Sequence, residues 1–440
     1  MHVIWAFVAF VAVCVACAAV MGARFLAWPG VRVANVKRHA NASSCAIMQV
    51  PGGDSVSMVL HNAMPDHSGV YNPSCAFVSS AQPDSARKEL VTTARISTFT
   101  FCPGANILQH ISRPFDFVGI TMGGRAYQVL VPDAWVTDDA AVAWRDSGGS
   151  GEWEIVAGTI AVPEKVVIMR QWAYEDPRVL ELAPGVLGIV VSIQSPNKHY
   201  IRVALLVVVM PSCTASASPS PSAVAIESHE PSILTPQSLV LFPTRGQNTK
   251  NWMARVCDGR IYFVVNVHPQ NVVSLALDDV LRARHIVVLE PRVDMTHGTS
   301  AGANDWRGNT VLVPLSSDLI SIVHRKHYDM WHWGQWGIKA WGATFEHAFA
   351  RFDATPPFAV RSVSRSFVIR PTLPEGARAQ FVFCTGLAPI PDTLQFLVTF
   401  GVDDCYEASC VFEQSEIDAL FSFSKTGDDA ICVKDVLVSV

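Results

Sequence analysis

The tetrapeptide Glu175-Asp176-Pro177-Arg178 carries the residue types best suited to proton transfer. Two adjacent carboxylates stand close to a guanidinium, and Pro177 restricts the backbone between them. A carboxylate held beside an arginine can exchange a proton near an anionic or polyhydroxy ligand. The same string also occurs in ordinary turns, where an aspartate before proline bonds to the turn backbone. The value of this tetrapeptide as evidence for a catalytic site depends on the other motifs of the chain.

Further polar motifs stand in a fixed order on both sides of this tetrapeptide. They are Tyr71-Asn72-Pro73-Ser74, Thr93-Ala94-Arg95-Ile96, Lys250-Asn251-Trp252, His268-Pro269, Arg307-Gly308-Asn309-Thr310, the strand end at His324, and Gly401-Val402-Asp403-Asp404. For Asp403 and Asp404, which follow a glycine in a turn, structural hydrogen bonds are favoured over catalysis.

The elements that must position these residues are short strands. Runs rich in β-branched or aromatic residues predict strands, as at 156–162, 188–193, 200–209, 261–267 and 394–400. Long amphipathic helices are few, and Ser415 to Phe423 is expected to form a short helix with Ser415 as its cap. This pattern is typical of an all-β sandwich, barrel or propeller.

Composition excludes several classes of protein. Of 440 residues, 50% are hydrophobic and 16% are charged, which excludes a disordered chain. The net charge is -5 with no long basic run, so neither nucleic acid nor a polybasic membrane contact is expected. Of the eleven cysteines, Cys14 and Cys17 lie in the apolar N-terminal segment. The other nine form no CxxC pair and no His/Cys cluster at zinc spacing, so neither a metal nor a cofactor is expected.

The N-terminal segment differs from the rest. Val3 to Met21 has no charged residue and as a helix would span roughly 28 Å, close to a bilayer core. Residues 1–30 are therefore expected to be a signal peptide or a membrane anchor, which places the protein in the secretory pathway, membrane-anchored or secreted. The basic residues from Arg24 to Arg38 follow the segment and favour a cytoplasmic C-terminal side, so the topology stays open.

Taken together, the motifs resemble glycoside hydrolase family 130, the five-bladed β-propeller β-mannoside phosphorylases, and the related β-1,2-mannosyltransferases. The resemblance covers about residues 70 to 412 and rests on the order of the motifs, of which Glu-Asp-Pro-Arg is the most specific. It implies a β-propeller domain over residues 45–435. The Ser/Pro-rich stretch 212–232 is then a loop inserted in that domain, because strand-like runs stand on both sides of it.

The resemblance also implies roles for individual residues. Asp176 matches the general acid/base, which acts through a sugar hydroxyl on a β-mannosidic bond. Basic residues that match the phosphate pocket are Arg95, Arg178, Lys250, His268 and His324. Such a pocket would hold phosphate or the leaving phosphate of a nucleotide-sugar donor, with a carbohydrate as the other substrate. Each residue also has a structural alternative, such as a salt-bridge partner for Arg178 or a solvated loop lysine for Lys250.

Two departures from the family pattern keep other functions open. The usual Ser-x-Asp-Gly stretch is missing, and the Gly-Gly-Thr turn is replaced by Gly308-Asn309-Thr310. We therefore weigh an inverting phosphorylase or glycosyltransferase against a catalytically inactive propeller that binds glycan or protein. A membrane-anchored structural protein without a ligand is the third hypothesis.

Overall fold

The computed structural model describes residues 69–79, 88–97, 116–122, 125–129, 131, 143–146, 153–156, 173–194, 201–211, 232–242, 250–267, 269–296, 306–328, 332–333, 339–340, 343–372, 381–403, 406–422 and 432–437. The apolar N-terminal segment, residues 212–231 of the Ser/Pro loop, and His268 lie outside these ranges. Within them, no helix has the length and apolar character needed to cross a membrane.

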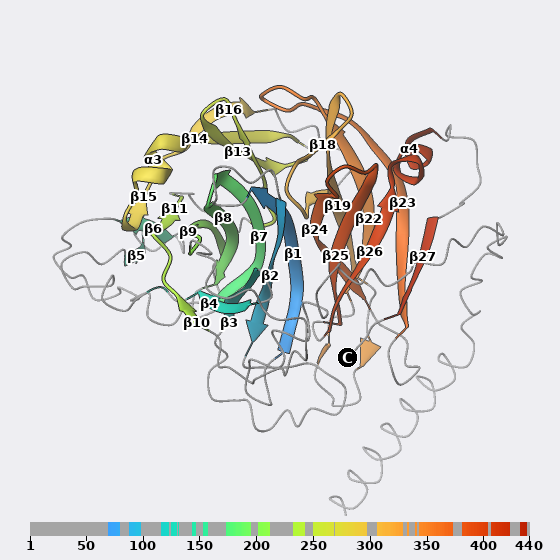
Figure 1. Ribbon diagram of the computed structural model, residues 1–440, viewed down its shortest axis with the longest axis horizontal. Coiled ribbons are helices and arrows are strands. Elements are labelled where there is room, and N and C mark those ends of the chain that lie inside the picture. The colour runs from blue at the N-terminus through green and yellow to red at the C-terminus, as the bar shows by residue number, and fades with distance from the viewer. Residues whose placement is uncertain are drawn as a thin grey trace, which may run out of the picture. The chain divides into compact units, whose positions relative to one another are not determined.

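Five sheets form the blades of a β-propeller, which confirms the fold expected from the motifs (Figure 1). Blade 1 consists of β1 (Gly69–Ser79), β2 (Lys88–Ser97), β3 (Asp116–Met122), β4 (Arg125–Val129) and β10 (Ser232–Leu234). Blade 2 consists of β7 (Ala173–Ala183), β8 (Val186–Gln194), β9 (Ile201–Val209), β11 (Ser238–Leu241) and β15 (His285–Val288). Blade 3 consists of β12 (Met253–Cys257), β13 (Arg260–Asn266), β14 (Asn271–Ala276) and β16 (Arg292–Thr296).

The last two blades come from the C-terminal part of the chain. Blade 4 consists of β17 (Arg307–Gly308), β18 (Val313–Leu315), β19 (Asp318–Tyr328), β22 (Ala343–Phe352), β23 (Val360–Thr372) and β27 (Cys432–Leu437). Blade 5 consists of β24 (Val382–Pro389), β25 (Gln395–Val402) and β26 (Tyr406–Glu413). Outside the blades are the pairs β5 (Ala143–Asp146) with β6 (Trp153–Val156) and β20 (His332–Trp333) with β21 (Lys339–Ala340), and the helices α3 (Leu277–Arg282) and α4 (Gln414–Ser422).

The strand predictions from apolar runs are confirmed where the structure describes them. The runs at 188–193, 200–209, 261–267 and 394–400 correspond to β8, β9, β13 and β25, each within two residues at either end. Of the run 156–162 only Val156 is described, at the end of β6. In β9, all residues from Val203 to Val208 are buried, because this strand has packed neighbours on both faces.

The hydrophobic core fills the spaces between neighbouring blades. One cluster joins blades 1 and 2 through residues such as Val91, Val179 and Leu206. A second joins blades 3 and 4 through Tyr262, Phe352 and their neighbours, and a small one joins blades 1 and 5. The largest cluster draws on blades 2 to 5. Apolar side chains thus hold blade to blade, while the inner strand edges are left to polar contacts.

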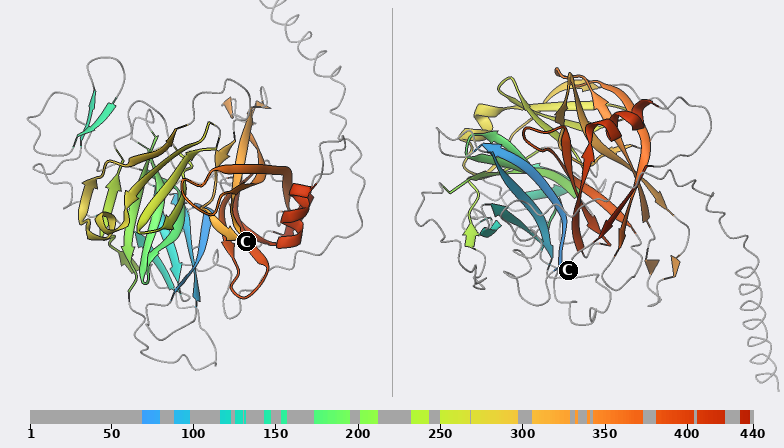
Figure 2. Two further views of the ribbon diagram at one scale, coloured as in Figure 1. Left: turned by 90° about the horizontal axis from the view of Figure 1, so that it is seen from above. Right: turned by 45° about the vertical axis from the view of Figure 1, so that its right-hand side comes forward.

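The inner edge strands of the blades lie next to one another. Strand β1 packs against β7 on one side and β24 on the other, as Figure 1 shows for the blue strand between the green and red sheets. Figure 2 shows the same succession of blades from two further directions. Strand β12 contacts β7, and β18 contacts β24. The ends of these strands therefore bring residues from all five blades to one region.

Hydrogen bonds to the Pro73 carbonyl join blade 5 to blade 1. Thr385 and Thr399 both donate their hydroxyls to it, at 2.5 and 2.6 Å. A Cβ atom on Gly401 would lie only 2.2 Å from Oδ1 of Asn72, so glycine is needed for this approach. Just beyond the same end of the β24–β25 pair, Asp403 Oδ1 accepts the Phe381 N–H at 2.8 Å. This confirms a structural hydrogen bond for Asp403, whereas Asp404 lies outside the described residues.

The helix predicted from Ser415 exists, but its start was misplaced. Helix α4 begins at Gln414, so Ser415 is inside the first turn and is not the cap. The Glu416 carboxylate accepts the backbone N–H of Glu413 at 2.8 Å, which is one half of a capping box. The side chain three residues into the helix, and not the serine, therefore marks the start.

Candidate active site

Asp176 projects from a bulge in the inner strand of blade 2. The register of β7 against β8 shifts between Glu175 and Arg178, so Asp176 and Pro177 form the irregular step. Asp176 has a φ of 49°, a left-handed conformation that aspartate and asparagine tolerate better than most residues. Such bulges re-aim a side chain out of the regular alternation of a strand. The Glu-Asp-Pro-Arg string is therefore an interrupted strand and not a loop.

Blade 1 presents an equivalent bulge directly opposite. Strand β1 shifts register between Tyr71 and Ser74, and Asn72 has a φ of 54° before Pro73. Asn72 is buried and donates from Nδ2 to Oδ1 of Asp176 at 2.8 Å. Two polar residues before proline, on neighbouring blades, thus hold each other in place. The sequence motif that contains Asn72 was noted, but its role as the partner of Asp176 was not predicted.

Three cations surround the Asp176 carboxylate. Nη1 of Arg95 lies 3.9 Å from its Oδ1, while Nη2 of Arg95 bonds Glu175 at 3.1 Å. Burial alone would raise the pKa of Asp176, but the charges of Lys250, Arg178 and Arg95 and the Asn72 bond outweigh it. The pKa of Asp176 therefore lies below its ordinary value. The group is an ionised carboxylate at neutral pH and can accept a proton.

Arg178 is buried at 1% exposure and ties three blades together. Its Nη1 donates to the Asp176 carbonyl at 2.8 Å and its Nη2 to Oδ1 of Asn251 at 2.7 Å. Its Nε donates to the carbonyl of Asn309. Burial lowers the pKa of Arg178 and the charge of Asp176 partly offsets this. Since each guanidinium nitrogen already has a protein acceptor, Arg178 acts on the site through its charge and its positioning of neighbours.

Blades 3 and 4 complete the cluster with asparagines. Asn251, with a φ of 67°, follows Lys250 just before β12 and is buried. Its carbonyl comes so close to Gly308 that a Cβ there would lie 2.6 Å away. Asn309 is fully buried, and neither atom of its side-chain amide has a hydrogen-bond partner among the described residues. Such a group calls for a bound water or a ligand atom.

A pair of buried histidines lies beside this cluster in blade 4. His324 of β19 stands opposite Arg307 of β17 and opposite His347 of β22. Burial, then the nearby His347, Arg178, Arg307 and Lys250, hold the pKa of His324 well below its ordinary value. His324 is therefore neutral at pH 7, and within the described parts of the chain its Nδ1 has no hydrogen-bond partner. It can exchange one hydrogen bond with a ligand and contributes no positive charge.

The structure brings together five of the six residues singled out from the sequence. Asp176, Arg95 and Arg178 are in direct contact or share a partner, and the charge of Lys250 lowers the pKa of Asp176. His324 lies close enough for the charges of Arg178 and Lys250 to lower its own pKa. His268 lies outside the described residues. Among the described residues, no group of His, Cys, Asp or Glu side chains is arranged to hold a metal ion.

The fold and the site together define a five-bladed β-propeller with a carboxylate–cation cluster at its inner strand edges. No protein-family model matches the chain, and no curated protein matches it. Similar solved structures include a glycosyl hydrolase from Bacteroides ovatus, with 12% identity, 79% of this chain and 84% of that chain covered, and a TM-score of 0.39. Another is the β-1,2-mannobiose phosphorylase from Listeria innocua in complex with β-1,2-mannobiose, with 11% identity, coverage of 81% and 94%, and a TM-score of 0.40. A third is RS223 β-xylosidase, with 12% identity, coverage of 83% and 97%, and a TM-score of 0.37. Identities this low assign no activity to the chain.

Proposed function

We propose that this protein is a glycan-active enzyme that forms or cleaves β-mannosidic bonds, as an inverting glycoside phosphorylase or a glycosyltransferase. The observation that carries this proposal is the ionised Asp176 carboxylate, held by Asn72 and faced by Arg95 and Lys250. A carboxylate so placed serves as a general base, and the excess of cations around it suits an anionic leaving group. The motif order noted in the sequence supplies the sugar class.

In the direction of synthesis, the ionised Asp176 takes the proton of the acceptor hydroxyl, directly or through a sugar hydroxyl. The acceptor oxygen then bonds to the anomeric carbon while the bond to the donor phosphate breaks. The electron pair leaves with the phosphate, and Lys250 and Arg95 stabilise its charge. Further hydrogen bonds to the bound substrates come from His324 and from the Asn309 amide, which has no partner in the part of the chain that the structure describes.

In the direction of cleavage, Asp176 must first carry a proton. Inorganic phosphate bound beside Lys250 and Arg95 would offset the cations that depress the pKa of Asp176. The carboxyl then becomes a competent acid only when phosphate is present. This coupling links the acid to its co-substrate and disfavours hydrolysis by water in the absence of phosphate.

The test is turnover of the full-length protein with a β-mannoside acceptor and either GDP-mannose or mannose 1-phosphate. Elongated product with release of GDP marks a transferase, and product from mannose 1-phosphate marks a phosphorylase running in reverse. Asp176→Asn should lower kcat by roughly 10²–10⁴-fold, the usual contribution of a general acid or base. Asp392→Asn is the matched control, since Asp392 is an exposed turn aspartate with a similar φ of 60°.

Two results would contradict the proposal. Unchanged turnover in Asp176→Asn would show that Asp176 is not the general acid/base. A folded protein that uses neither donor but binds glycans supports instead the non-catalytic propeller.

A further inference from the structure

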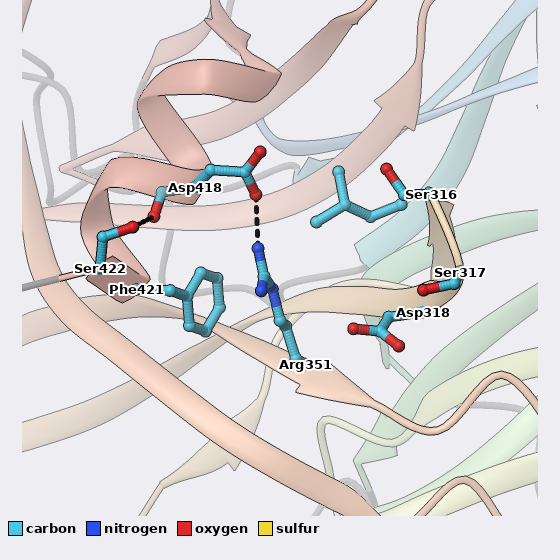
Figure 3. Close-up of a pocket in the computed structure, with 8 residues that line it drawn as sticks. Ser316, Ser317, Asp318, Arg351, Asp418, Phe421 and Ser422 are labelled. Carbon is cyan, nitrogen blue, oxygen red and sulfur yellow. Dashed lines mark hydrogen bonds and ion pairs between the residues drawn. The ribbon is translucent and has the colours of Figure 1, made fainter.

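A cleft of about 440 Å³ lies at the end of blade 4 that is farther from His324 (Figure 3). It is bounded by the turn Ser316–Ser317 between β18 and β19, by Arg351 of β22, and by Asp418 and Phe421 of α4. Asp318 at the start of β19 is six residues from His324, which corresponds to roughly 20 Å along the strand. The cleft is therefore separate from the Asp176 cluster.

Arg351 forms the rigid wall of this cleft. Its guanidinium lies over the ring of Phe421, 4.2 Å from the ring centroid, and bonds to Oδ1 of Asp418. Figure 3 shows Arg351 and Asp418 on one side of the cleft and Ser316, Ser317 and Asp318 on the other. The side chain of Asp418 remains 43% exposed, while the two contacts of the Arg351 guanidinium hold it in place. A planar donor fixed by stacking costs little entropy when a ligand binds.

Each carboxylate that lines the cleft has a guanidinium partner. Asp418 bonds to Arg351, and Asp318 lies 2.6 Å from Nη1 of Arg361, which also bonds to Asp353. An anion therefore gains no net attraction here, and neither lining carboxylate is without a cationic partner. The groups that remain available are hydroxyls and the free sides of the paired charges, since Ser316 accepts a bond from Gln414 at 2.9 Å and keeps its own O–H. Hydroxyls beside already paired carboxylate and guanidinium groups offer both donors and acceptors, which match the hydroxyls of a neutral sugar.

We propose that this cleft binds a neutral saccharide unit, independently of the chemistry at Asp176. Its volume lies within the range of small-molecule sites, roughly 300–1,000 Å³. None of the residues that line it belongs to the Asp176 cluster. The cleft therefore binds a saccharide without reacting with it. It would hold part of a longer glycan, or a second glycan, at the end of blade 4 away from the Asp176 cluster.

The test uses full-length Asp176→Asn protein, so that turnover cannot consume the probe. Neutral manno-oligosaccharides are titrated by isothermal calorimetry and ligand-detected NMR, before and after the added change Ser317→Trp, which fills the cleft from an exposed turn position. The number of saccharides bound per chain should fall by one, whether or not the central site also binds. Val293→Trp, at a position 64% exposed on blade 3, is the matched control and should leave binding unchanged.

The outcomes separate this inference from the proposed enzyme activity. Equal binding with and without Ser317→Trp overturns the cleft, whatever the turnover assay shows. Competition for this site by inorganic phosphate overturns the assignment of a neutral ligand. If Ser317→Trp lowers the unfolding temperature, Asp418→Asn is used in its place, because this change keeps the shape of the side chain and removes only its charge. Asp418→Asn should weaken saccharide binding about tenfold. Unchanged affinity would equally overturn the proposed binding site in the cleft.

Discussion

The buried histidine His347 should make the protein less stable in mild acid by an amount that can be worked out. Its side chain is 3% exposed, accepts the Cys384 N–H on Nε2 at 3.3 Å and stacks on Phe367. Burial lowers the pKa of His347 from 6.5 to about 4. The unfolded chain then binds one more proton than the folded chain between these two pH values, so stability is complete above pH 6.5 and falls as the pH drops towards 4. The gap corresponds to about 3 kcal/mol, at roughly 1.4 kcal/mol for each pH unit.

The variant His347→Gln removes this titration and keeps an acceptor for the Cys384 N–H. Urea unfolding of the wild type and the variant at several pH values from 7.5 to 4 measures the free energy of unfolding of each. Their difference should shift by about 3 kcal/mol in favour of the variant over this range. His324 is present in both proteins, so its contribution largely cancels.

The control is His285→Asn, because His285 is exposed and has a φ of 60°, which asparagine tolerates. This variant should follow the wild-type pH dependence. Parallel stability curves for the wild type and His347→Gln would refute the reasoning, since they would mean that the folded protein protonates His347 as readily as the unfolded chain does.

Two further changes test how the inner strands hold together. Gly401→Ala places a Cβ atom 2.2 Å from Oδ1 of Asn72, so it should lower the free energy of unfolding by about 1–3 kcal/mol. It should also lower turnover, because it displaces Asn72, the hydrogen-bond partner of Asp176. A melting curve like that of the wild type would contradict this packing. Arg178→Lys keeps the charge but leaves carbonyl acceptors of two other blades unbonded, so chemical denaturation should show a loss of about 2–5 kcal/mol. The exposed Arg282→Lys on α3 should change stability by less than about 0.5 kcal/mol, and an equally small effect at Arg178 would exclude its role as a tie between blades.

Much of the fold could be predicted because apolar runs report burial directly. Runs such as 203–208 are buried over their whole length between packed neighbours, and a continuous apolar run is what that environment selects. Helix α3 was missed because Leu277–Arg282 is too short for a helical period to show. The start of α4 was misplaced because Ser415 looked like a cap, whereas the bond from Glu416 back to Glu413 decides the boundary.

The candidate site was predictable by residue type but not by role. Asp176, Arg95 and Lys250 stood out because carboxylates and cations are the groups that move protons and hold phosphate. The sequence could not show that the guanidinium of Arg178 is already hydrogen-bonded to protein acceptors. Those acceptors are the Asn309 carbonyl and the Asn251 side chain, which are 131 and 73 residues away in the chain. Such contacts arise only when three blades meet.

A repeated pattern in the sequence, a polar residue before a proline within a strand, indicates two positions of the site. Asn72-Pro73 and Asp176-Pro177 are the same device, a polar residue with positive φ before proline at a bulge in an inner strand. Proline cannot continue the ladder of hydrogen bonds, so an acidic or amide residue before a proline inside a strand-like run indicates a bulge that aims the polar side chain away from the sheet. This pattern in the sequence singles out Asn72 and Asp176 as side chains that both leave their strands, while their hydrogen bond to each other depends on the packing of the two blades.

The same bulges serve both the stability of the propeller and its proposed chemistry. Pro73, which forms the bulge of β1, accepts the hydrogen bonds that join blade 5 to blade 1, while the residue before it holds Asp176. Arg178, next to the bulge of β7, joins blades 3 and 4 and also lowers the pKa of Asp176. Residues held at positive φ cost free energy that the packing around them must repay. A substitution at Asn72 or Asp176 that relieves the backbone strain but removes the polar side chain should therefore not stabilise the fold. It would break the contacts between neighbouring blades and the site at the same time.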